Sequence, residues 1–519
     1  MPAAATSALL NRKHTFMPQS PVPVLQAVDA ISAEALIIVI LRLAGQALGP
    51  RAAELDAAMS GIITRACSSE KLAESGACID LVPPQAISTR RVIILSLGKP
   101  EALTALSLAR AGGSLAAHLE DLGETEATLV LDSVAEANLS QAEILARVAL
   151  GSRLRRYRFD LRNKRPVAEA DKAWHLQLVG ADKHALDVAL TRTNAVAEGV
   201  EYARTLVNLP PNYLHPDSFA AHLAPLREAG IEVQVLEAAE LKDLGMNALL
   251  AVGAGSVRPP RLAVLRYRGE GSGEQPLAFV GKGVCFDSGG LCIKGGMQMF
   301  DMKADMAGAA AVVGLLLSLA RQKSPVHAVG VLGIAENLPS GTSLKPRDIV
   351  TTASGQTVEV FDTDAEGRLI LADCLHYTAT RFEPSVIVDL ATLTYSVMRG
   401  LGSIFAGLFS TDDAIATEMI AAGEKVGERF WRLPLDRAYD EGLKSPLADL
   451  RHHAKDMEDG DSPYAAAFLR HFTEDRPWVH LDIAGKELAP EDRPLGREGA
   501  TAFGVQMLEE WVQTNRKGA

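Results

Sequence analysis

Short apolar runs alternate with longer amphipathic stretches over the first 190 residues of the chain. Residues 91–98 and 127–131 are apolar runs of strand length, and residues 101–118 between them are rich in Ala and Leu. Residues 35–41 are also strongly apolar, but the run is too short for a membrane helix, so we interpret it as a buried strand. This alternation of strands and a helix predicts a small α/β domain at residues 1–190.

The same alternation returns in residues 191–519, where it predicts a larger catalytic α/β domain with a central mixed sheet covered by helices. Residues 307–321 are rich in glycine and alanine and apolar on nearly all faces, which indicates a buried helix. Helices are also expected at residues 195–206 and from Gly367 onward. Strands are expected at residues 261–266, 277–280, 326–334 and 386–390, and a hairpin at residues 349–352 and 357–360.

Composition indicates a globular protein with a large core. Hydrophobic residues make up 48% and charged residues 22% of 519 residues, a length that favours two domains. The formal net charge of -12 argues against a surface for nucleic acid or anionic lipid, so we expect neither nucleic acid nor a membrane as a partner. The five cysteines show no paired spacing, which is typical of a reducing cytoplasm and predicts a cytoplasmic protein.

The first residues leave two interpretations open. The first ~30 contain no apolar signal core, so secretion is not indicated. A disordered tail is one interpretation of this stretch, and a weak organellar presequence is the other.

A dense set of charged residues lies between Lys282 and Arg368, in segments that are otherwise apolar and rich in glycine. We expect these charged residues on loops that follow strands, where open α/β sheets place their sites. Four acidic residues supply negative charges that two divalent cations would balance: Asp287, Asp305, Asp364 and Glu366. Oxygen ligands of this kind suit Zn, Mn, Mg or Co.

The alternative to a metal site is a network of ion pairs with nearby cations, namely Lys282, Lys294, Lys303 and Arg368. An Asp-x-Glu-x-Arg segment and a Lys-x4-Asp segment, both in glycine-rich stretches, favour the metals, because isolated carboxylates in apolar surroundings would each cost roughly several kcal/mol. Other hydrolase and nucleotide motifs are absent from the sequence. It contains no phosphate loop, no His-Glu-x-x-His and no Gly-x-Ser-x-Gly around Ser288.

The octapeptide at residues 362–369, Asp-Thr-Asp-Ala-Glu-Gly-Arg-Leu, resembles the signature of the leucyl (cytosol) aminopeptidase family, in which Asn is usual at the first position. Residues 281–294 resemble the first metal segment of that family, and the likeness extends from about residue 195 to Gly485. The resemblance implies a metal-dependent aminopeptidase, a hydrolase of peptide bonds that releases N-terminal residues from peptides. Leucine or other apolar residues would be preferred.

Matching positions imply two divalent ions per subunit, with Mn or Zn favoured. The tighter ion would be held by Lys282, Asp287, Asp305 and Glu366, and the more exchangeable ion by Asp287, Asp364 and Glu366. A lysine can ligate only as the neutral amine, so Lys282 is expected to have a strongly depressed pKa beside a dication. The resemblance also implies a homohexamer.

Lys294 and Arg368 are the expected catalytic residues. Lys294 would remain charged and donate to the oxyanion that develops on the scissile carbonyl. Arg368 opens a helix, where an anion is favoured, and the resemblance implies a bicarbonate there that relays the proton. A salt bridge from Arg368 to Asp362 or Asp373 is the alternative.

The pocket for the first side chain of the substrate would include Met302 and Thr392, again by resemblance. Tyr395 stands where the family usually has glycine, and residues 460–464 replace a more apolar, glycine-rich stretch. These departures point to a changed substrate preference.

Two other functions stay open on the sequence alone. One is another di-metal hydrolase, for example of phosphate esters. The other is a catalytically altered relative with a binding or regulatory role related to DNA.

Overall fold

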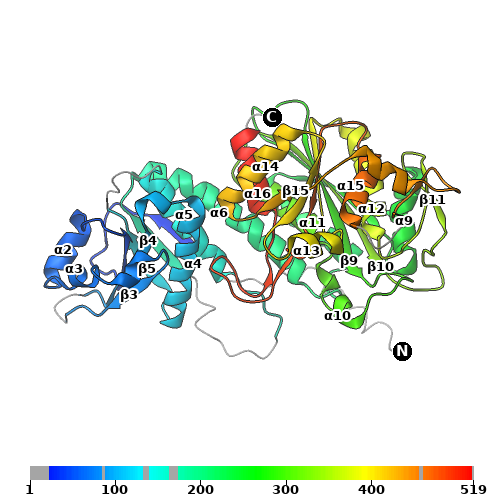
Figure 1. Ribbon diagram of the computed structural model, residues 1–519. Coiled ribbons are helices and arrows are strands. Elements are labelled where there is room, and N and C mark those ends of the chain that lie inside the picture. Colours follow the sequence, from blue (N-terminus) through cyan, green and yellow to red (C-terminus); the bar gives the residue numbers. More distant parts are fainter. Residues whose placement is uncertain (1–22, 85–87, 133–138, 163–173, 455–459, 517–519) are drawn as a thin grey trace, which may run out of the picture. The chain divides into compact units, whose positions relative to one another are not determined.

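The structure is a computed structural model, which describes residues 23–84, 88–132, 139–162, 174–454 and 460–516. The chain divides into two compact units, coloured along the sequence in Figure 1. The smaller unit extends to Ala197 and also takes residues 489–498, whereas the larger unit comprises Glu198–Leu488 and the residues from Gly499 onward. The sequence-based division at residues 190 and 191 did not anticipate that a late segment joins the smaller unit.

The smaller unit contains a six-stranded sheet in the order β1-β6-β5-β2-β4-β3. Neighbouring strands are parallel except β3, which is antiparallel to β4. The strands are β1 (Val24–Ala27), β2 (Ile37–Leu43), β3 (Cys78–Leu81), β4 (Arg91–Gly98), β5 (Glu126–Val130) and β6 (His175–Val179). Its helices include α2 (Pro50–Ala58), α3 (Ile62–Ala66), α4 (Ala105–Asp121) and α5 (Gln141–Arg156).

The strands and the helix predicted for this unit are present as β2, β4, β5 and α4. Their buried Ile, Leu, Val and Ala side chains form the core between the sheet and the helices. The interpretation of the first thirty residues as a disordered tail is wrong for Val24–Ala27, because β1 pairs with β6 there. Residues 1–22 lie outside the described part of the chain.

The larger unit is built on an eight-stranded mixed sheet in the order β15-β14-β17-β13-β9-β10-β8-β7. β9 is parallel to both of its neighbours, β10 and β13, whereas β10 and β8 are antiparallel. The strands are β7 (Glu232–Leu236), β8 (Arg261–Arg268), β9 (Leu277–Asp287), β10 (His327–Asn337), β13 (Val386–Ala391), β14 (Ala406–Ser410), β15 (Phe430–Arg432) and β17 (Trp478–Asp482). This is the mixed central sheet that the sequence predicted.

Helices surround this sheet, and a small sheet joins the predicted hairpin to a third strand. The longest helices of the unit are α6 (Lys183–Asn208, which begins before the division), α11 (Ala307–Arg321), α12 (Glu366–Phe382), α14 (Asp413–Val426), α15 (Asp461–Arg470) and α16 (Val505–Asn515). The shorter ones include α7 (Pro216–His222), α8 (Ala238–Asp243), α9 (Asn247–Val252), α10 (Gly296–Met299) and α13 (Tyr395–Leu401). The small sheet contains β11 (Ile349–Thr351), β12 (Thr357–Glu359) and β16 (Leu450–Arg451). Among the described residues, the helices include none with the length and apolar character of a membrane span.

α11 and α12 pack against opposite faces of β9. A Cβ atom added at Gly281 would lie 2.5 Å from the Cα of Ala309 in α11, so the helix approaches closely only because Gly281 lacks a side chain. The next residue of the strand, Lys282, points to the other face, since side chains alternate along a strand. Its side chain lies beside Gly367 of α12.

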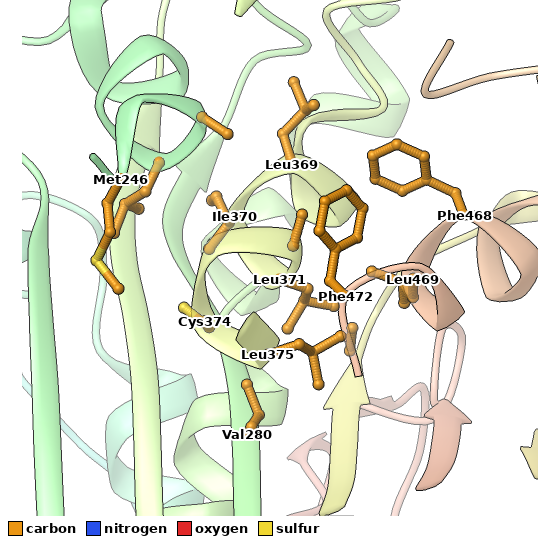
Figure 2. Packing of buried hydrophobic residues seen from close by; sticks show 14 of the residues in the cluster. Met246, Val280, Leu369, Ile370, Leu371, Cys374, Leu375, Phe468, Leu469 and Phe472 are labelled. Atoms are coloured by element: carbon orange, nitrogen blue, oxygen red, sulfur yellow. The ribbon is translucent and has the colours of Figure 1, made fainter. Parts of the chain in front are cut away.

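The main apolar cluster of the larger unit lies between α12, the sheet and α15. Figure 2 shows Leu369 and Leu371 of α12 among the side chains of Phe468, Leu469 and Phe472, all of which are buried. Cys374 is also buried in this cluster, as expected for a cysteine that behaves as a small hydrophobe. This packing fixes the first turn of α12, which carries part of the charged cluster, against the edge of the sheet.

β9 is longer than the sequence predicted. The predicted strand ended at Val280, but the structure continues it to Asp287, because β10 pairs with it along this whole length. The expectation that the charged residues lie on loops is therefore wrong for Lys282 and Asp287. Both belong to the strand itself.

Candidate active site

Three neighbouring segments bring the predicted metal ligands together. Lys282 and Asp287 lie on β9, and Asp305 follows the short helical turn Met302–Ala304. Asp364 and Glu366 lie at the start of α12. The parallel strands β9, β10 and β13 all end at this edge of the sheet, which is where open α/β sheets place their sites.

Carboxylate oxygens converge in this cluster. Asp287, Asp364 and Glu366 each offer one oxygen, and these oxygens all lie within 4.8 Å of one another. The Nζ atom of Lys282 lies 2.9 Å from Oδ1 of Asp305 and 2.8 Å from Oε1 of Glu366. All five residues predicted to hold metal ions are thus neighbours in space.

The donor set fits hard divalent cations. Oδ2 of Asp305 and Oε2 of Glu366 are buried and have no hydrogen-bond partner among the described residues. A buried carboxylate oxygen without a partner is costly, and a cation within bonding distance would satisfy it. The oxygen-rich set with one lysine amine is therefore suited to metal ions and not only to ion pairs.

Burial and mutual repulsion raise the pKa of several carboxyl groups. Burial and the charges of Asp287 and Glu366 raise the pKa of Asp364 to about 7. Burial and the charge of Asp287 also raise the pKa of Glu366. The sequence-based expectation for Lys282 was a depressed pKa beside a dication. Burial acts to lower the pKa of Lys282, but without a dication the surrounding carboxylates outweigh it and raise that pKa above the ordinary value. The depressed pKa beside a dication stays a prediction.

Lys294 pairs with two further carboxylates of the cluster. Its Nζ atom is 2.8 Å from Oδ2 of Asp287 and forms an ion pair with Asp364. These carboxylates raise its pKa against the effect of burial, so the side chain is charged. Nζ also donates to the hydroxyl of Tyr395 at 3.3 Å and lies 5.2 Å from the centre of its ring.

Arg368 is buried and makes a two-pronged ion pair with Asp461. Nη1 donates to Oδ1 of Asp461 at 2.9 Å, and Nη2 donates to Oδ2 at 2.7 Å. Nη1 also donates to the carbonyl oxygen of His452 at 2.9 Å. Asp461 is a residue that the sequence reasoning missed.

The alternative partners expected for Arg368 are engaged elsewhere. Asp362 accepts a hydrogen bond from the backbone N–H of Asp364. Asp373 accepts from the backbone of Leu249 and Ala353. The sequence did offer one signal for Asp461, since it lies in residues 460–464, a stretch that departs from the family pattern.

A pocket of about 500 Å³ opens onto the charged cluster. Met302 and Thr392 line it, as do Lys294, Tyr395 and Asp461. Thr392 donates from its hydroxyl to Oδ1 of Asp305 at 2.6 Å, and its carbonyl oxygen accepts from Nζ of Lys282 at 3.0 Å. The two residues predicted to bind substrate thus share one cavity with four of the five predicted ligands.

Gly367 determines how closely α12 can approach β9. A Cβ atom at this position would lie 2.7 Å from Cε of Lys282 and 2.9 Å from its Nζ. Lys282 is buried and held by three acceptors, so its end could not move aside without leaving them. The absence of a side chain at Gly367 allows Lys282 and Glu366 to meet.

Comparison with known proteins agrees with this geometry. A model of the catalytic domain of the cytosol aminopeptidase family matches residues 201–509, and a model of its N-terminal domain matches residues 37–165. A probable cytosol aminopeptidase of Agrobacterium fabrum is 42% identical over 94% of this chain and 97% of its own length. A relative with the same description from Rhodopseudomonas palustris is 42% identical over 88% of this chain and 91% of its own.

Solved structures are similar over nearly the whole chain. The bottromycin maturation enzyme BotP in complex with Mn superimposes with a TM-score of 0.80 at 32% identity, covering 92% of this chain and 99% of that protein. The family models and the relatives agree, and the chain belongs to the cytosol aminopeptidase family.

Proposed function

We propose that this aminopeptidase uses two divalent ions per subunit, Mn or Zn, to release N-terminal leucine or other apolar residues from peptides. The observation that carries the proposal is the convergence of Asp287, Asp364 and Glu366 within 4.8 Å, beside Asp305 and Lys282. Membership of a metal-dependent peptidase family supports it, as does a similar structure in complex with Mn.

The residues that would hold the ions are those of the cluster. The tighter ion would take Lys282, Asp287, Asp305 and Glu366, and the second would take Asp287, Asp364 and Glu366. When bound, a pair of divalent cations lowers the pKa of water and polarises a carbonyl group. The family resemblance would assign Asp287 and Glu366 to both ions.

Lys294 is the residue we assign to stabilising the oxyanion. It is charged, lines the pocket and lies within hydrogen-bonding distance of Asp287. A fixed cation that lines the pocket stabilises negative charge that develops on the substrate. Tyr395 accepts a hydrogen bond from Nζ, which helps to orient the lysine.

The pocket walls support a preference for apolar residues. Met302, Thr392 and Met398 line the cavity, and Tyr395 extends into it with 37% of its surface exposed. The phenol reduces the space next to Lys294, so we expect the first side chain of the substrate to pack against its ring. The family usually has glycine at this position. Tyr395 therefore affects the proposed preference for leucine more directly than any other part of the proposal.

We also propose a cytoplasmic location and a homohexamer. The location is supported by cysteines that are all free and by the descriptions of the relatives as cytosol aminopeptidases. The hexamer rests on the family resemblance alone. A role in DNA binding is disfavoured, because the net charge is -12 and the pocket contains the groups that hydrolysis needs.

The test uses the purified protein with amino-acid anilides of leucine, arginine and glutamate. Activity should vanish with a chelator and return with Mn or Zn. Lys294→Ala should lower kcat by roughly 100- to 1,000-fold, as expected for losing one oxyanion donor. The matched control is Lys425→Ala, since Lys425 forms an ion pair with Glu510 outside the pocket.

Two results would contradict the proposal. The first is no turnover of any anilide with metals loaded. The second is metal-dependent hydrolysis of a phosphate ester in place of the anilides, which would favour the other class of di-metal hydrolase.

A further inference from the structure

The chemistry proposed above leaves one task without a residue. Hydrolysis needs a group that takes a proton from the attacking water and later gives it to the leaving amine. The carboxylates of the cluster are assigned to ions, and Lys294 is assigned to the oxyanion and pairs with Asp287 and Asp364. The remaining groups that line the pocket must supply this proton acceptor.

The acidic and imidazole groups of the pocket that are not assigned to ions are Asp301, Asp362, Asp461, Glu487 and His453. Asp461 differs from the others because Arg368 binds both of its oxygens. Burial acts to raise the pKa of Asp461, but the charge and hydrogen bonds of Arg368 outweigh it and lower that pKa. The side chain is therefore an anion at neutral pH and able to accept a proton.

The position of Asp461 is fixed from two sides. Arg368 is 1% exposed and belongs to the first turn of α12, two residues beyond Glu366. On the other side, the backbone N–H of Ser462 donates to the hydroxyl of Ser396 at 2.7 Å, and Ser396 follows Tyr395 in the pocket wall. The carboxylate is thus held at the start of α15 while 22% of its side chain remains exposed.

The guanidinium of Arg368 is already hydrogen-bonded within the protein, which disfavours the binding of a dissolved anion. Both terminal nitrogens of Arg368 are bound to Asp461, and Nη1 also donates to His452. The Nε atom has no hydrogen-bond partner among the described residues, but it is buried and faces no solvent. The bicarbonate that the family resemblance implied at Arg368 therefore competes with a carboxylate that the chain itself provides.

We propose that Asp461 is a catalytic residue whose carboxylate, held on Arg368, replaces a dissolved anion as the proton acceptor and donor in peptide hydrolysis. This inference rests on the proposed aminopeptidase function. Asp461 takes a proton as the oxygen of water forms its bond to the scissile carbonyl carbon. When the carbon–nitrogen bond breaks, the same proton moves to the leaving nitrogen. The products are a carboxylic acid and an amine, and Asp461 is again a carboxylate.

Two substitutions separate the chemical role of the Asp461 carboxylate from the effect of its volume. Asp461→Gly removes the side chain and leaves room for a small anion on Arg368, whereas Asp461→Asn keeps the shape and one hydrogen-bond acceptor. In buffer depleted of carbon dioxide, wild-type turnover of leucine anilide should be the same with and without added bicarbonate. Both variants should lose roughly 100-fold or more in kcat, the usual contribution of a general base. Bicarbonate or formate should restore part of the rate to Asp461→Gly but not to Asp461→Asn.

A second measurement does not depend on activity. Chelator-treated Asp461→Gly should bind formate in a calorimetric titration, whereas the wild type should show no binding. If the wild type turned over no anilide, the proposed function would fail, and this titration would still report whether Asp461 fills the anion position.

The control is Asp440→Asn. Asp440 pairs with Arg470 and His471, much as Asp461 pairs with Arg368 and His453, but it does not line the pocket. Its variant should keep wild-type kcat. The proposal is overturned if wild-type activity falls when bicarbonate is removed, if the wild type binds formate, or if Asp461→Gly keeps its full rate without added anion. If Asp461→Gly does not fold, the kcat of Asp461→Asn still tests the proposal, because this variant keeps the shape of the side chain.

Discussion

β4 in the smaller unit and β9 in the larger unit are both buried strands with a neighbour on each side, but their chemistry differs. β4 is buried from Val92 to Gly98, and its polar residue Ser96 donates to the carbonyl oxygen of Leu72. β9 is equally buried but contains Lys282 and Asp287. A buried charge costs stability unless it is paired or ligated, whereas a buried apolar side chain adds to stability. The comparison teaches that β4 serves the fold, while β9 gives up part of its stabilising role to form a site.

The largest effect is expected from Glu366→Gln, which tests whether the charged groups around β9 serve function more than stability. Loss of a metal ligand should lower activity by more than the roughly 10- to 100-fold typical of residues that support ligands. The free energy of unfolding of the chelator-treated protein should stay the same or rise, because one of several clustered negative charges is removed. Anilide turnover, metal content and urea unfolding provide the three measurements. If Glu366→Gln stayed active but had a lower free energy of unfolding, the charged groups around β9 would serve stability more than function.

Ile94→Ala provides the opposite test in β4. Ile94 is fully buried, so truncation should lower the free energy of unfolding by about 2–5 kcal/mol. The kcat of the remaining folded enzyme should not change, since Ile94 belongs to the unit without the site. Val188→Ala is the matched control, because Val188 is 59% exposed and its truncation should shift stability by roughly 0.5 kcal/mol or less. A loss of kcat in the folded Ile94 variant would show that β4 also serves catalysis.

The smallest effect concerns Glu428, a buried acid in the larger unit but outside the pocket. It accepts hydrogen bonds from the backbone of Gly504 and Met507, and burial raises its pKa to about 7. The unfolded chain loses this proton near pH 4.5, whereas the folded protein retains it up to about pH 7. Rising pH through this window therefore favours unfolding.

Glu428→Gln should remove that pH dependence. Between pH 5 and 8 the wild type should lose roughly 2–3 kcal/mol more stability than the variant, as two pKa units imply. Urea unfolding of chelator-treated protein at both pH values provides the measurement, and anilide turnover at pH 7 should be unchanged. Equal pH dependence in the two proteins would show that the Glu428 carboxyl is not held protonated by burial.

The sequence predicted most of the secondary structure because apolar runs of strand length are a local signal. It predicted the strand at residues 91–98 to the residue, but it ended the strand at residues 277–280 too early. Glycines and charges normally interrupt a strand, and the pairing of β9 with β10 overrides them. That pairing is a tertiary effect, which the sequence of one strand does not contain.

The predicted site residues are neighbours in the structure, because the octapeptide and the lysine–aspartate segment are recognisable on their own. The sequence did not predict the partner of Arg368, because no local motif contains both residues of that ion pair. Asp461 is 93 residues away along the chain, and the sequence reasoning considered only acids close to Arg368, namely Asp362 and Asp373. An ion pair between distant segments leaves no spacing to recognise.

Gly367 shows how little is needed to disable such a site. Adding one carbon atom there would place it 2.7 Å from the side chain of Lys282 while leaving every charged residue of the cluster in the sequence. A relative that carried alanine at this position would retain all the acids and both lysines and would differ from the octapeptide only at its glycine. Its helix and strand would no longer fit together. An assignment based only on the acids and lysines would then wrongly identify it as an active enzyme.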